Sequence, residues 1–269
     1  MGSGIAQVTA TGGYSTLLYD VDEKMVEKGR NTIEQNLRVL VERGKIPAGE
    51  RDMVLGRLSY STDIRDCRAD LVIEAVVEKP EVKNDLFLRL AAIIRSDTIL
   101  ASNTSSLSLN ALAEKIPGPE RFAGMHFFNP APLMKLVEIV RTRYTSEATI
   151  DTITRVAKTL GKASVLCTDS PGFIVNHVAR PFYLEALHLL EERLTDIETI
   201  DTLMEATGFR MGPFRLMDLI GNDINYAVSV SVYEALDRPD RLKPSPIQRL
   251  KVEEGSLGRK TGKGYYRYE

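Results

Sequence analysis

A histidine and a glutamate twelve positions apart are the residues of this chain best suited to proton transfer. His126 stands in the run GMHFFNP, and Glu138 stands in the run KLVEIV. Each run has the apolar composition of a short strand or strand end, so we expect the two side chains to meet across neighbouring strands. A carboxylate that binds one imidazole nitrogen fixes the tautomer, so that the other nitrogen can take a substrate proton. The alternative is a core histidine beside a glutamate that faces water.

The start of the chain has the features of a dinucleotide-binding segment. The run MGSGIAQ contains Gly2 and Gly4, and the apolar run STLLY is followed by Asp20. This order is typical of the end of a glycine-rich turn, then a helix, a strand and a carboxylate that binds the adenosine ribose. The glycines would let the backbone approach a pyrophosphate at the helix N-terminus. An acidic residue at the strand end favours NAD over NADP.

Composition excludes several classes of function. The chain has 269 residues, 43% of them hydrophobic, which is enough for a large core in two domains. The formal net charge of -2 gives no electrostatic reason to expect nucleic acid or an anionic membrane as partner. There is no apolar run of membrane-spanning length and no signal-peptide pattern, so we expect a cytoplasmic protein. Cys67 and Cys167 lack metal-ligand spacing, so we expect reduced thiols and no metal site.

The first two-thirds of the chain alternate short apolar runs with helical patterns. This alternation predicts a parallel sheet with crossover helices. The strand candidates are 16–19, 71–75, 98–101, 122–127, 136–140 and 163–167. Segment 22–44 has apolar positions at helical spacing and a highly charged opposite face, so we expect an amphipathic helix there within a helical hairpin near 22–58. A further helix is expected over 148–160, ending at Gly161.

No strand pattern recurs beyond the tract TDSPG at 168–172. Helices are expected over 173–191 and 196–206, the second introduced by a capping box of Thr195 and Glu198, and then from Pro213 past Gly221. The fold class is therefore α/β, with a Rossmann-type, doubly wound, mostly parallel sheet followed by an all-α C-terminal domain. We expect an NAD-binding domain over 1–168 and a helical domain for substrate binding and dimerisation over 169–269.

Taken together, these regions resemble the short-chain L-3-hydroxyacyl-CoA dehydrogenase family, which includes bacterial 3-hydroxybutyryl-CoA dehydrogenases. The resemblance extends almost from end to end. It depends on GSGIAQ at 2–7, Asp20, VVE at 76–78 with KN at 83–84, SNTSS at 102–106, HFFNP at 126–130, PGFIVN at 171–176, MGPF at 211–214 and TGKGYY at 261–266. In the family a first strand and a Gly-x-Gly pair come before these residues. We therefore expect that this chain lacks that strand and the first two phosphate-binding glycines, and that a full-length product is the functional species.

The resemblance implies NAD-dependent oxidation of an (S)-3-hydroxyacyl-CoA to the 3-ketoacyl-CoA, and the reverse reaction. His126 would take the proton of the C3 hydroxyl while the hydride passes to the nicotinamide, and Glu138 would orient His126. Ser105 would hydrogen-bond the reacting oxygen, and Asn176 would bind substrate from the second domain. Asn129 is a supporting residue. The pathway could be fatty-acid β-oxidation, butanoate or polyhydroxyalkanoate metabolism, or the degradation of aromatic acids.

The resemblance also implies residues that bind cofactor and coenzyme A, and it implies a homodimer formed through the helical domain. The cofactor residues are Gly2, Gly4, Asp20, Glu78, Lys83 and Asn103. Arg43 in the helical arm would contact a phosphate of CoA. Simpler interpretations are also open. Glu78 and Lys83 could be ordinary surface residues, and the charged face of the helical arm could simply be solvated. Ser105 could belong to a turn that caps a helix, and Asn176 could be an ordinary helical residue.

Two other functions stay open at this point. One is a dehydrogenase of a free hydroxy acid such as a sugar acid, because some relatives share the His–Glu pair without needing CoA. The other is a non-catalytic relative comparable to the λ-crystallins. Retention of His126, Glu138, Ser105 and Asn176 together argues against the second alternative, whereas a missing first strand would argue for it.

Overall fold

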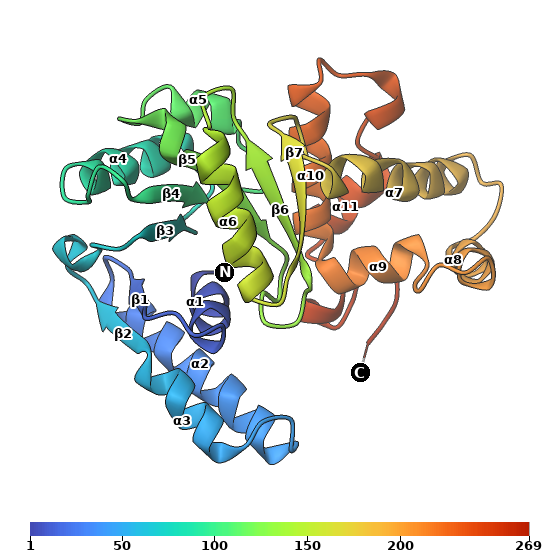
Figure 1. The fold of residues 1–269 in the computed structure, drawn as a ribbon. Helices are drawn as coiled ribbons and strands as arrows, with labels where there is room; N and C mark the ends of the chain where they lie inside the picture. The colour runs from blue at the N-terminus through green and yellow to red at the C-terminus, as the bar shows by residue number, and fades with distance from the viewer. Residues whose placement is uncertain (269) are drawn as a thin grey trace. The chain divides into compact units, whose positions relative to one another are not determined.

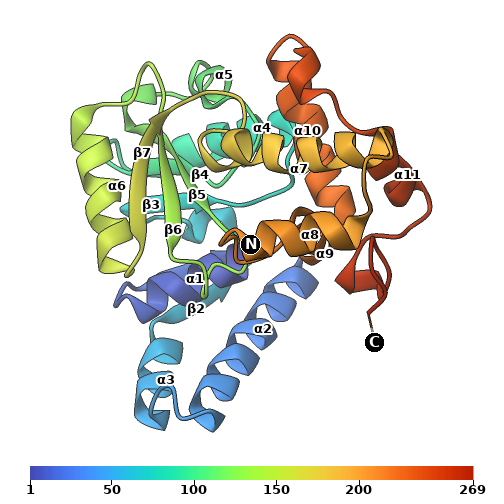
Figure 2. The same ribbon diagram turned by 90° about the vertical axis from the view of Figure 1, so that its right-hand side faces the viewer.

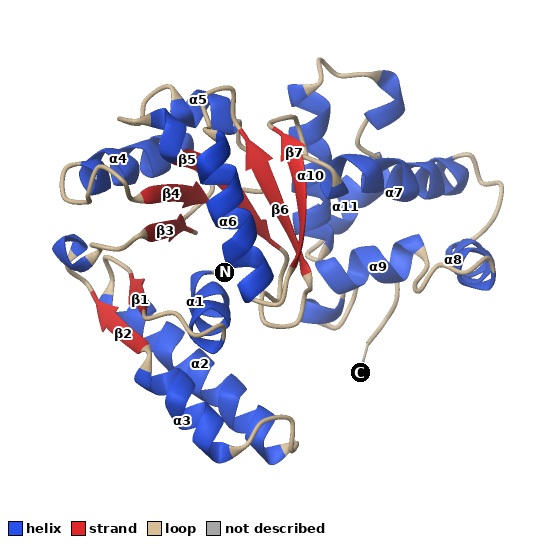
Figure 3. Cartoon of the chain, viewed as in Figure 1, coloured by secondary structure: helices blue, strands red, loops and turns tan. Residues whose placement is uncertain are grey.

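The computed structural model describes residues 1–268. By the density of its internal contacts the chain divides into two compact units, Met1–Asp169 and Ser170–Glu269. Figure 1 traces the chain by residue number, and Figure 3 separates helices from strands. Each unit is described below by itself.

The larger sheet of the first unit has five strands in the order β3-β4-β5-β6-β7. Their bounds are Leu71–Glu74, Ile99–Ser102, Phe122–Phe127, Leu136–Arg141 and Ala163–Thr168. The β3-β4, β4-β5 and β6-β7 pairs are parallel, and only the β5-β6 pair is antiparallel. Parallel neighbours need crossover connections, and helices supply them here. The prediction of a mostly parallel α/β sheet is confirmed.

A second sheet pairs β1 (Thr16–Tyr19) in parallel with β2 (Leu58–Ser61). Within residues 1–268 no strand pairing joins this sheet to the larger one. The sequence does not predict β2, because its residues, Leu-Ser-Tyr-Ser, form no continuous apolar run. The expected single sheet is therefore present as two.

The helices of the first unit are α1 (Gly2–Thr11), α2 (Glu23–Glu42), α3 (Ala48–Gly56), α4 (Pro80–Ala91), α5 (Leu109–Ala113) and α6 (Glu147–Thr159). Asp22 caps α2 by accepting a hydrogen bond from the Lys24 N–H. The apolar stripe of α2, with Ile33 and Leu37 fully buried, packs with Val54 of α3. The two helices lie side by side in both views (Figures 1 and 2).

The two faces of β5 pack against different helices, because successive residues of a strand point to opposite faces. Met125 packs with Ile153 of α6 in the largest buried apolar cluster. On the other face, the ring of Phe122 meets Phe87 of α4 edge-on, with ring centroids 5.2 Å apart. His126 shares the face of Phe122. Buried side chains of this size each contribute about 1.5–3 kcal/mol, so both faces of this strand are firmly held.

The second unit contains the helices α7 (Val175–Glu191), α8 (Ile197–Ala206), α9 (Pro213–Ile220), α10 (Asn222–Ala235) and α11 (Pro246–Glu253). Among residues 170–268 there are isolated bridges but no named strand. A core of Tyr183, Leu187, Ile200, Phe214 and Met217 joins α7, α8 and α9. No helix in the described part of the chain combines the length and the apolar character needed to cross a bilayer.

Two sequence expectations for this unit are wrong in detail. The cap of α8 is Asp196 rather than Thr195, since the Asp196 carboxylate accepts a hydrogen bond of 2.8 Å from the Thr199 N–H. The helix that starts at Pro213 does not continue past Gly221. It ends at Ile220, because Gly221 has a φ of 104°, which a helix does not contain and which residues other than glycine rarely adopt.

Candidate active site

His126 and Glu138 face each other across the β5-β6 hairpin. They are direct partners in the antiparallel register, so their side chains lie on the same face. The Nδ1 atom of His126 is 2.7 Å from Oε2 of Glu138, and the two side chains are only 7% and 1% exposed. An ionised carboxylate can only accept a hydrogen bond, so an ionised Glu138 requires the proton on Nδ1 of His126. Proton exchange with a bound molecule would therefore use Nε2.

The residues after β5 include an aromatic ring and a turn. The ring of Phe128 lies against the His126 ring, with centroids 4.6 Å apart. Asn129 is exposed and precedes Pro130 through a cis peptide bond. At the end of β5, the N–H of Phe127 donates a hydrogen bond of 2.8 Å to Oδ1 of Asn103. Asn103 follows β4, so this contact joins the ends of two neighbouring strands beside the histidine.

Glu78 holds the loop that carries Ser105. Its Oε1 accepts hydrogen bonds from the N–H groups of Ser105 at 2.9 Å and Ser106 at 3.2 Å, and from the hydroxyl of Thr104. Burial favours the neutral acid, but these hydrogen bonds and the charge of Lys83 outweigh it and hold the pKa of Glu78 below its ordinary value. The carboxylate is therefore ionised and fixes the course of the backbone at Ser105.

Lys83 is buried between two carboxylates and is not a surface residue. Its Nζ lies 2.6 Å from Oε1 of Glu74 and 3.1 Å from Oε2 of Glu78, and the Lys83 side chain is 1% exposed. The other oxygen of Glu74 accepts a hydrogen bond of 2.6 Å from the hydroxyl of Ser102. Sequence reasoning missed Glu74, because it is the last residue of the apolar strand β3. An acid inside an apolar run is the signal that could have identified it.

The glycines of α1 differ in what their lack of a side chain allows. A Cβ at Gly4 would lie 3.3 Å from Ala131 and Pro132, so Gly4 permits close packing of that loop against α1. A Cβ at Gly2 would meet only Leu18, at 3.7 Å, so there is space beside Gly2 in the first turn of α1. Asp20 follows β1 and is half-buried, and its Oδ1 accepts a hydrogen bond of 3.0 Å from the Asp22 N–H. Space beside a glycine at a helix N-terminus, together with a strand-end acid, fits a dinucleotide.

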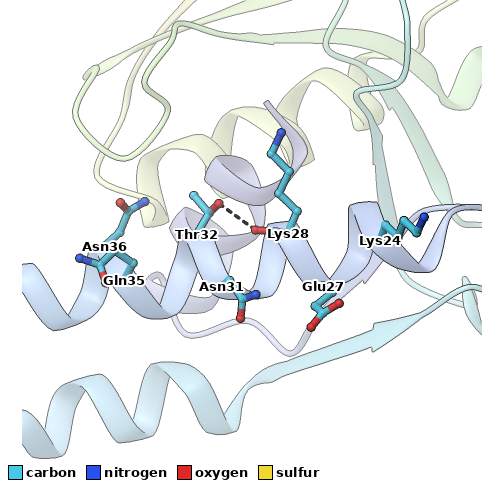
Figure 4. Close-up of a pocket in the computed structure, with 7 residues that line it drawn as sticks. All are labelled: Lys24, Glu27, Lys28, Asn31, Thr32, Gln35 and Asn36. Carbon is cyan, nitrogen blue, oxygen red and sulfur yellow. Dashed lines mark hydrogen bonds between the residues drawn. The ribbon is translucent and has the colours of Figure 1, made fainter.

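A hollow of about 610 Å³ lies along α2 (Figure 4). It is lined by Lys24, Glu27, Lys28, Asn31, Thr32, Gln35 and Asn36. Asn36 is anchored there, because its amide donates a hydrogen bond of 3.0 Å to Oε1 of Gln7. Arg43 follows the last residue of α2 and is not part of the lining. The structure therefore does not bring Arg43 to this hollow.

Asn176 is the second residue of α7, in the second unit. The turn before it depends on Gly172, which has a φ of 75° and whose missing Cβ would lie 3.0 Å from the His177 nitrogen. The carbonyl oxygen of Asn176 accepts a hydrogen bond of 2.9 Å from Nε of Arg180. The start of α7 is thus fixed by a glycine turn and a buried arginine.

No group of three or more His, Cys, Asp or Glu residues within 1–268 could hold a metal ion. Cys67 and Cys167 are free thiols. Burial raises the pKa of each to about 11, so both are neutral at pH 7.

A mostly parallel sheet with a glycine in the first turn of a helix, a strand-end acid and a buried imidazole–carboxylate pair is typical of nicotinamide-dependent alcohol dehydrogenases. Residues 1–170 match the NAD binding domain of 3-hydroxyacyl-CoA dehydrogenase, and residues 172–268 match the C-terminal domain of the same family. The chain belongs to the 3-hydroxyacyl-CoA dehydrogenase family, whose members are NAD-dependent oxidoreductases.

Named relatives are similar over essentially the whole chain. It is 46% identical over 99% of its length to the 3-hydroxyadipyl-CoA dehydrogenase of Escherichia coli, but it spans only 56% of that protein. It is 42% identical to a probable 3-hydroxybutyryl-CoA dehydrogenase of Deinococcus radiodurans, with 100% of this chain and 96% of the relative covered. The crystal structure of (S)-3-hydroxybutyryl-CoA dehydrogenase from Ralstonia eutropha matches with a TM-score of 0.95 at 37% identity, covering 100% and 95% of the two chains.

Proposed function

We propose that this chain catalyses the reversible, NAD-dependent oxidation of (S)-3-hydroxyacyl-CoA to 3-ketoacyl-CoA. The observation that carries the proposal is the buried hydrogen bond of 2.7 Å between His126 and Glu138. A strand-to-strand pair of this kind holds an imidazole in one tautomer, and the carboxylate stabilises its protonated form. Family membership supplies the reaction class, and the pair supplies the acid–base group that the reaction needs.

In the oxidation, Nε2 of His126 takes the proton of the C3 hydroxyl as the C3–O bond becomes a carbonyl. Bound NAD⁺ supplies the acceptor for the C3 hydride. Glu138 keeps the proton on Nδ1 and stabilises the imidazolium that forms. In the reduction His126 starts protonated and returns the proton to the oxygen. Positioned acid–base groups contribute about 10²–10⁴-fold to such rates.

The remaining site residues bind and orient the substrate. Ser105 hydrogen-bonds the reacting oxygen, and the Glu78 carboxylate fixes the backbone from which it does so. Asn176 contacts the substrate from the second unit. Asn129 supports the turn that follows β5.

NAD is assigned to the residues at the carboxyl ends of the strands and at the start of α1. The first turn of α1 at Gly2 takes the pyrophosphate, with Gly4 next to it, and Asp20 takes the ribose. The contacts at the ends of β3 and β4 come from Glu78 and Asn103. Lys83 acts through Glu78, because it is buried between Glu74 and Glu78.

Coenzyme A is assigned to the helical arm near 22–58. The hollow along α2 supplies Lys24 and Lys28 as cations for its phosphates (Figure 4). Arg43 is retained as a phosphate contact outside that hollow. We assign residues 1–168 to cofactor binding and residues 169–269 to substrate binding and to homodimer formation. We also propose a cytoplasmic location and a place in fatty-acid metabolism, with the other pathways named above as alternatives.

Two acyl groups are candidates. The relatives from D. radiodurans and R. eutropha favour a short chain, 3-hydroxybutyryl-CoA. The relative from E. coli, which has the higher identity, is named for a six-carbon acyl group with a terminal carboxylate.

The test is the loss of NADH absorbance with acetoacetyl-CoA, compared between the wild type and Glu138→Gln. Turnover that falls at least about 100-fold in Glu138→Gln, with NADH binding retained, would support the proposal. Glu147→Gln is the matched control, because Glu147 is an exposed carboxylate at the start of α6 that pairs with Arg141 of β6. A folded wild type that binds NADH but reduces no 3-ketoacyl-CoA would overturn the proposal in favour of a free hydroxy acid or a non-catalytic role.

A further inference from the structure

Arg180 is a buried cation whose hydrogen bonds within residues 1–268 all go to uncharged acceptors. It is 3% exposed and lies on α7. Its Nε donates to the carbonyl oxygen of Asn176 at 2.9 Å, and its Nη1 donates to the carbonyl oxygen of Asn225 at 3.0 Å and to the hydroxyl of Ser229 at 2.9 Å. The described residues offer Arg180 these acceptors and the ring face of Tyr183, whose centroid lies 4.9 Å from Cζ, but no carboxylate.

Such an arrangement is unusual, because buried charges in proteins are normally paired with an opposite charge. Burial lowers the pKa of Arg180 to about 10, so the guanidinium remains protonated at pH 7 and keeps its charge. Its Nη2 makes no hydrogen bond within residues 1–268. Two N–H groups of this atom can therefore donate to an anion.

The side chains around Arg180 also have unused hydrogen-bonding capacity. Gln248 donates a hydrogen bond of 3.0 Å to Oδ1 of Asn225, but Nδ2 of Asn225 and Oε1 of Gln248 are buried without a partner. Both residues are at most 1% exposed. We call Arg180, Asn225, Ser229 and Gln248 the Arg180 cluster. It joins α7, α10 and α11, which contact one another, and α7 and α10 can be followed in Figures 1 and 2.

We propose that the Arg180 cluster binds the terminal carboxylate of a dicarboxylic 3-hydroxyacyl-CoA. This inference rests on the proposed function, in which Asn176 contacts the substrate. Arg180 lies four residues after Asn176, which corresponds to about 6 Å along α7. A substrate that contacts Asn176 therefore has the Arg180 side chain within about one helical turn.

The positive charge of Arg180 also favours a dicarboxylic substrate. A carboxylate would give the Arg180 guanidinium the anionic partner that the described residues do not supply, in a bond stronger than one between neutral groups. Asn225 Nδ2 is a further donor to such a carboxylate. An acyl chain that ends in a methyl group would leave the arginine charge without a counterion.

The experiment compares two substrates of equal chain length, 3-hydroxyadipyl-CoA and 3-hydroxyhexanoyl-CoA, which differ in the terminal carboxylate. We expect the wild-type kcat/KM to be about 10- to 100-fold higher for the diacid, in keeping with a charged hydrogen bond. Arg180→Met should bring this ratio close to one. Arg249→Met is the matched control and should keep the ratio, because Arg249 is exposed and pairs with Glu253 on α11.

The wild-type ratio alone can overturn the inference, so the test does not depend on whether Arg180→Met folds. Equal kcat/KM values for the two substrates would overturn it, as would a preference that Arg180→Met retains. Arg180→Lys keeps the positive charge but lacks the planar guanidinium. Its ratio of kcat/KM for the two substrates should therefore lie between the ratios of the wild type and Arg180→Met. Oxidation of 3-hydroxybutyryl-CoA without a preference for the diacid overturns this inference alone. Oxidation of none of the three acyl-CoAs overturns the proposed function as well.

Discussion

The Glu78 carboxylate accepts a hydrogen bond of 2.9 Å from the backbone N–H of Ser105. Glu78 follows β3 and Ser105 follows β4, so this bond joins the ends of two neighbouring parallel strands. Lys83 lies 3.1 Å from the second oxygen of Glu78 and links it to Glu74 in the interior. The position of Ser105 therefore depends on an ion-pair network that starts in the core.

Glu78→Gln should weaken this loop in a pH-dependent way. The pKa of Glu78 is lowered in the folded state, so its ionised form stabilises the fold. That stabilisation is fully present above the ordinary value for a glutamate, about 4.3, and is lost as pH falls through the lowered folded-state value. The difference in unfolding free energy between the wild type and Glu78→Gln should therefore be largest near neutral pH and should shrink in acid. Denaturation at a series of pH values measures it, and a constant difference would contradict the assignment.

Lys83→Met should destabilise the first unit strongly. It leaves the Glu74 carboxylate buried without its cation, at a cost of about 3–5 kcal/mol. The double variant Glu74→Gln with Lys83→Met removes both charges and should recover part of that loss. Urea denaturation of the three proteins gives the comparison. A loss below about 1 kcal/mol in the single variant would mean that the pair is solvated.

Glu138→Gln should lower turnover by about 10²–10⁴-fold while NADH affinity changes little. The amide keeps the shape of the side chain but cannot stabilise a protonated His126. Steady-state rates with acetoacetyl-CoA, together with NADH titration by fluorescence, separate the two effects. Equal losses of turnover and of NADH affinity would make Glu138 a structural residue only.

The two directions of the reaction should respond to pH in opposite senses. Oxidation requires neutral His126, so its rate should fall as acid protonates the imidazole. Reduction requires the protonated ring, so it should persist at lower pH and decline in base. Initial rates in both directions across pH 5–10 test this, and superimposable profiles would exclude His126 as the group that exchanges the proton.

The sequence predicts the elements best where the apolar pattern is strong. The strands β5 and β6 are buried along most of their length, and their apolar runs identify them. The strand β2 is not predicted, because half of its residues are serine. Gly221 ends a helix through its own dihedral angle, which hydrophobic periodicity does not report. Local backbone geometry is the information that the pattern lacks.

Prediction of the site has a similar limit. Residues with intrinsic reactivity, such as His126, are visible in a sequence. The ion pairs of Lys83 are not, because Glu74 is nine positions away and becomes a neighbour only when β3 and α4 fold against each other. The hydrogen bonds of Arg180 are likewise not visible in the sequence, since its acceptors on α10 are 45 and 49 positions distant. Reactive residues are therefore easier to predict from the sequence than the residues that hold them in place.

The hydrogen bond between His126 and Glu138 is formed within a single hairpin whose strands follow each other in the chain. Side chains alternate along a strand, so a shift of one residue in this pairing would turn Glu138 to the opposite face of the sheet. A change in the length of segment 128–135 between the strands is therefore compatible with activity only if it preserves this register. We expect one-residue insertions or deletions there to abolish activity in a protein that still folds, whereas longer changes at other exposed loops are tolerated.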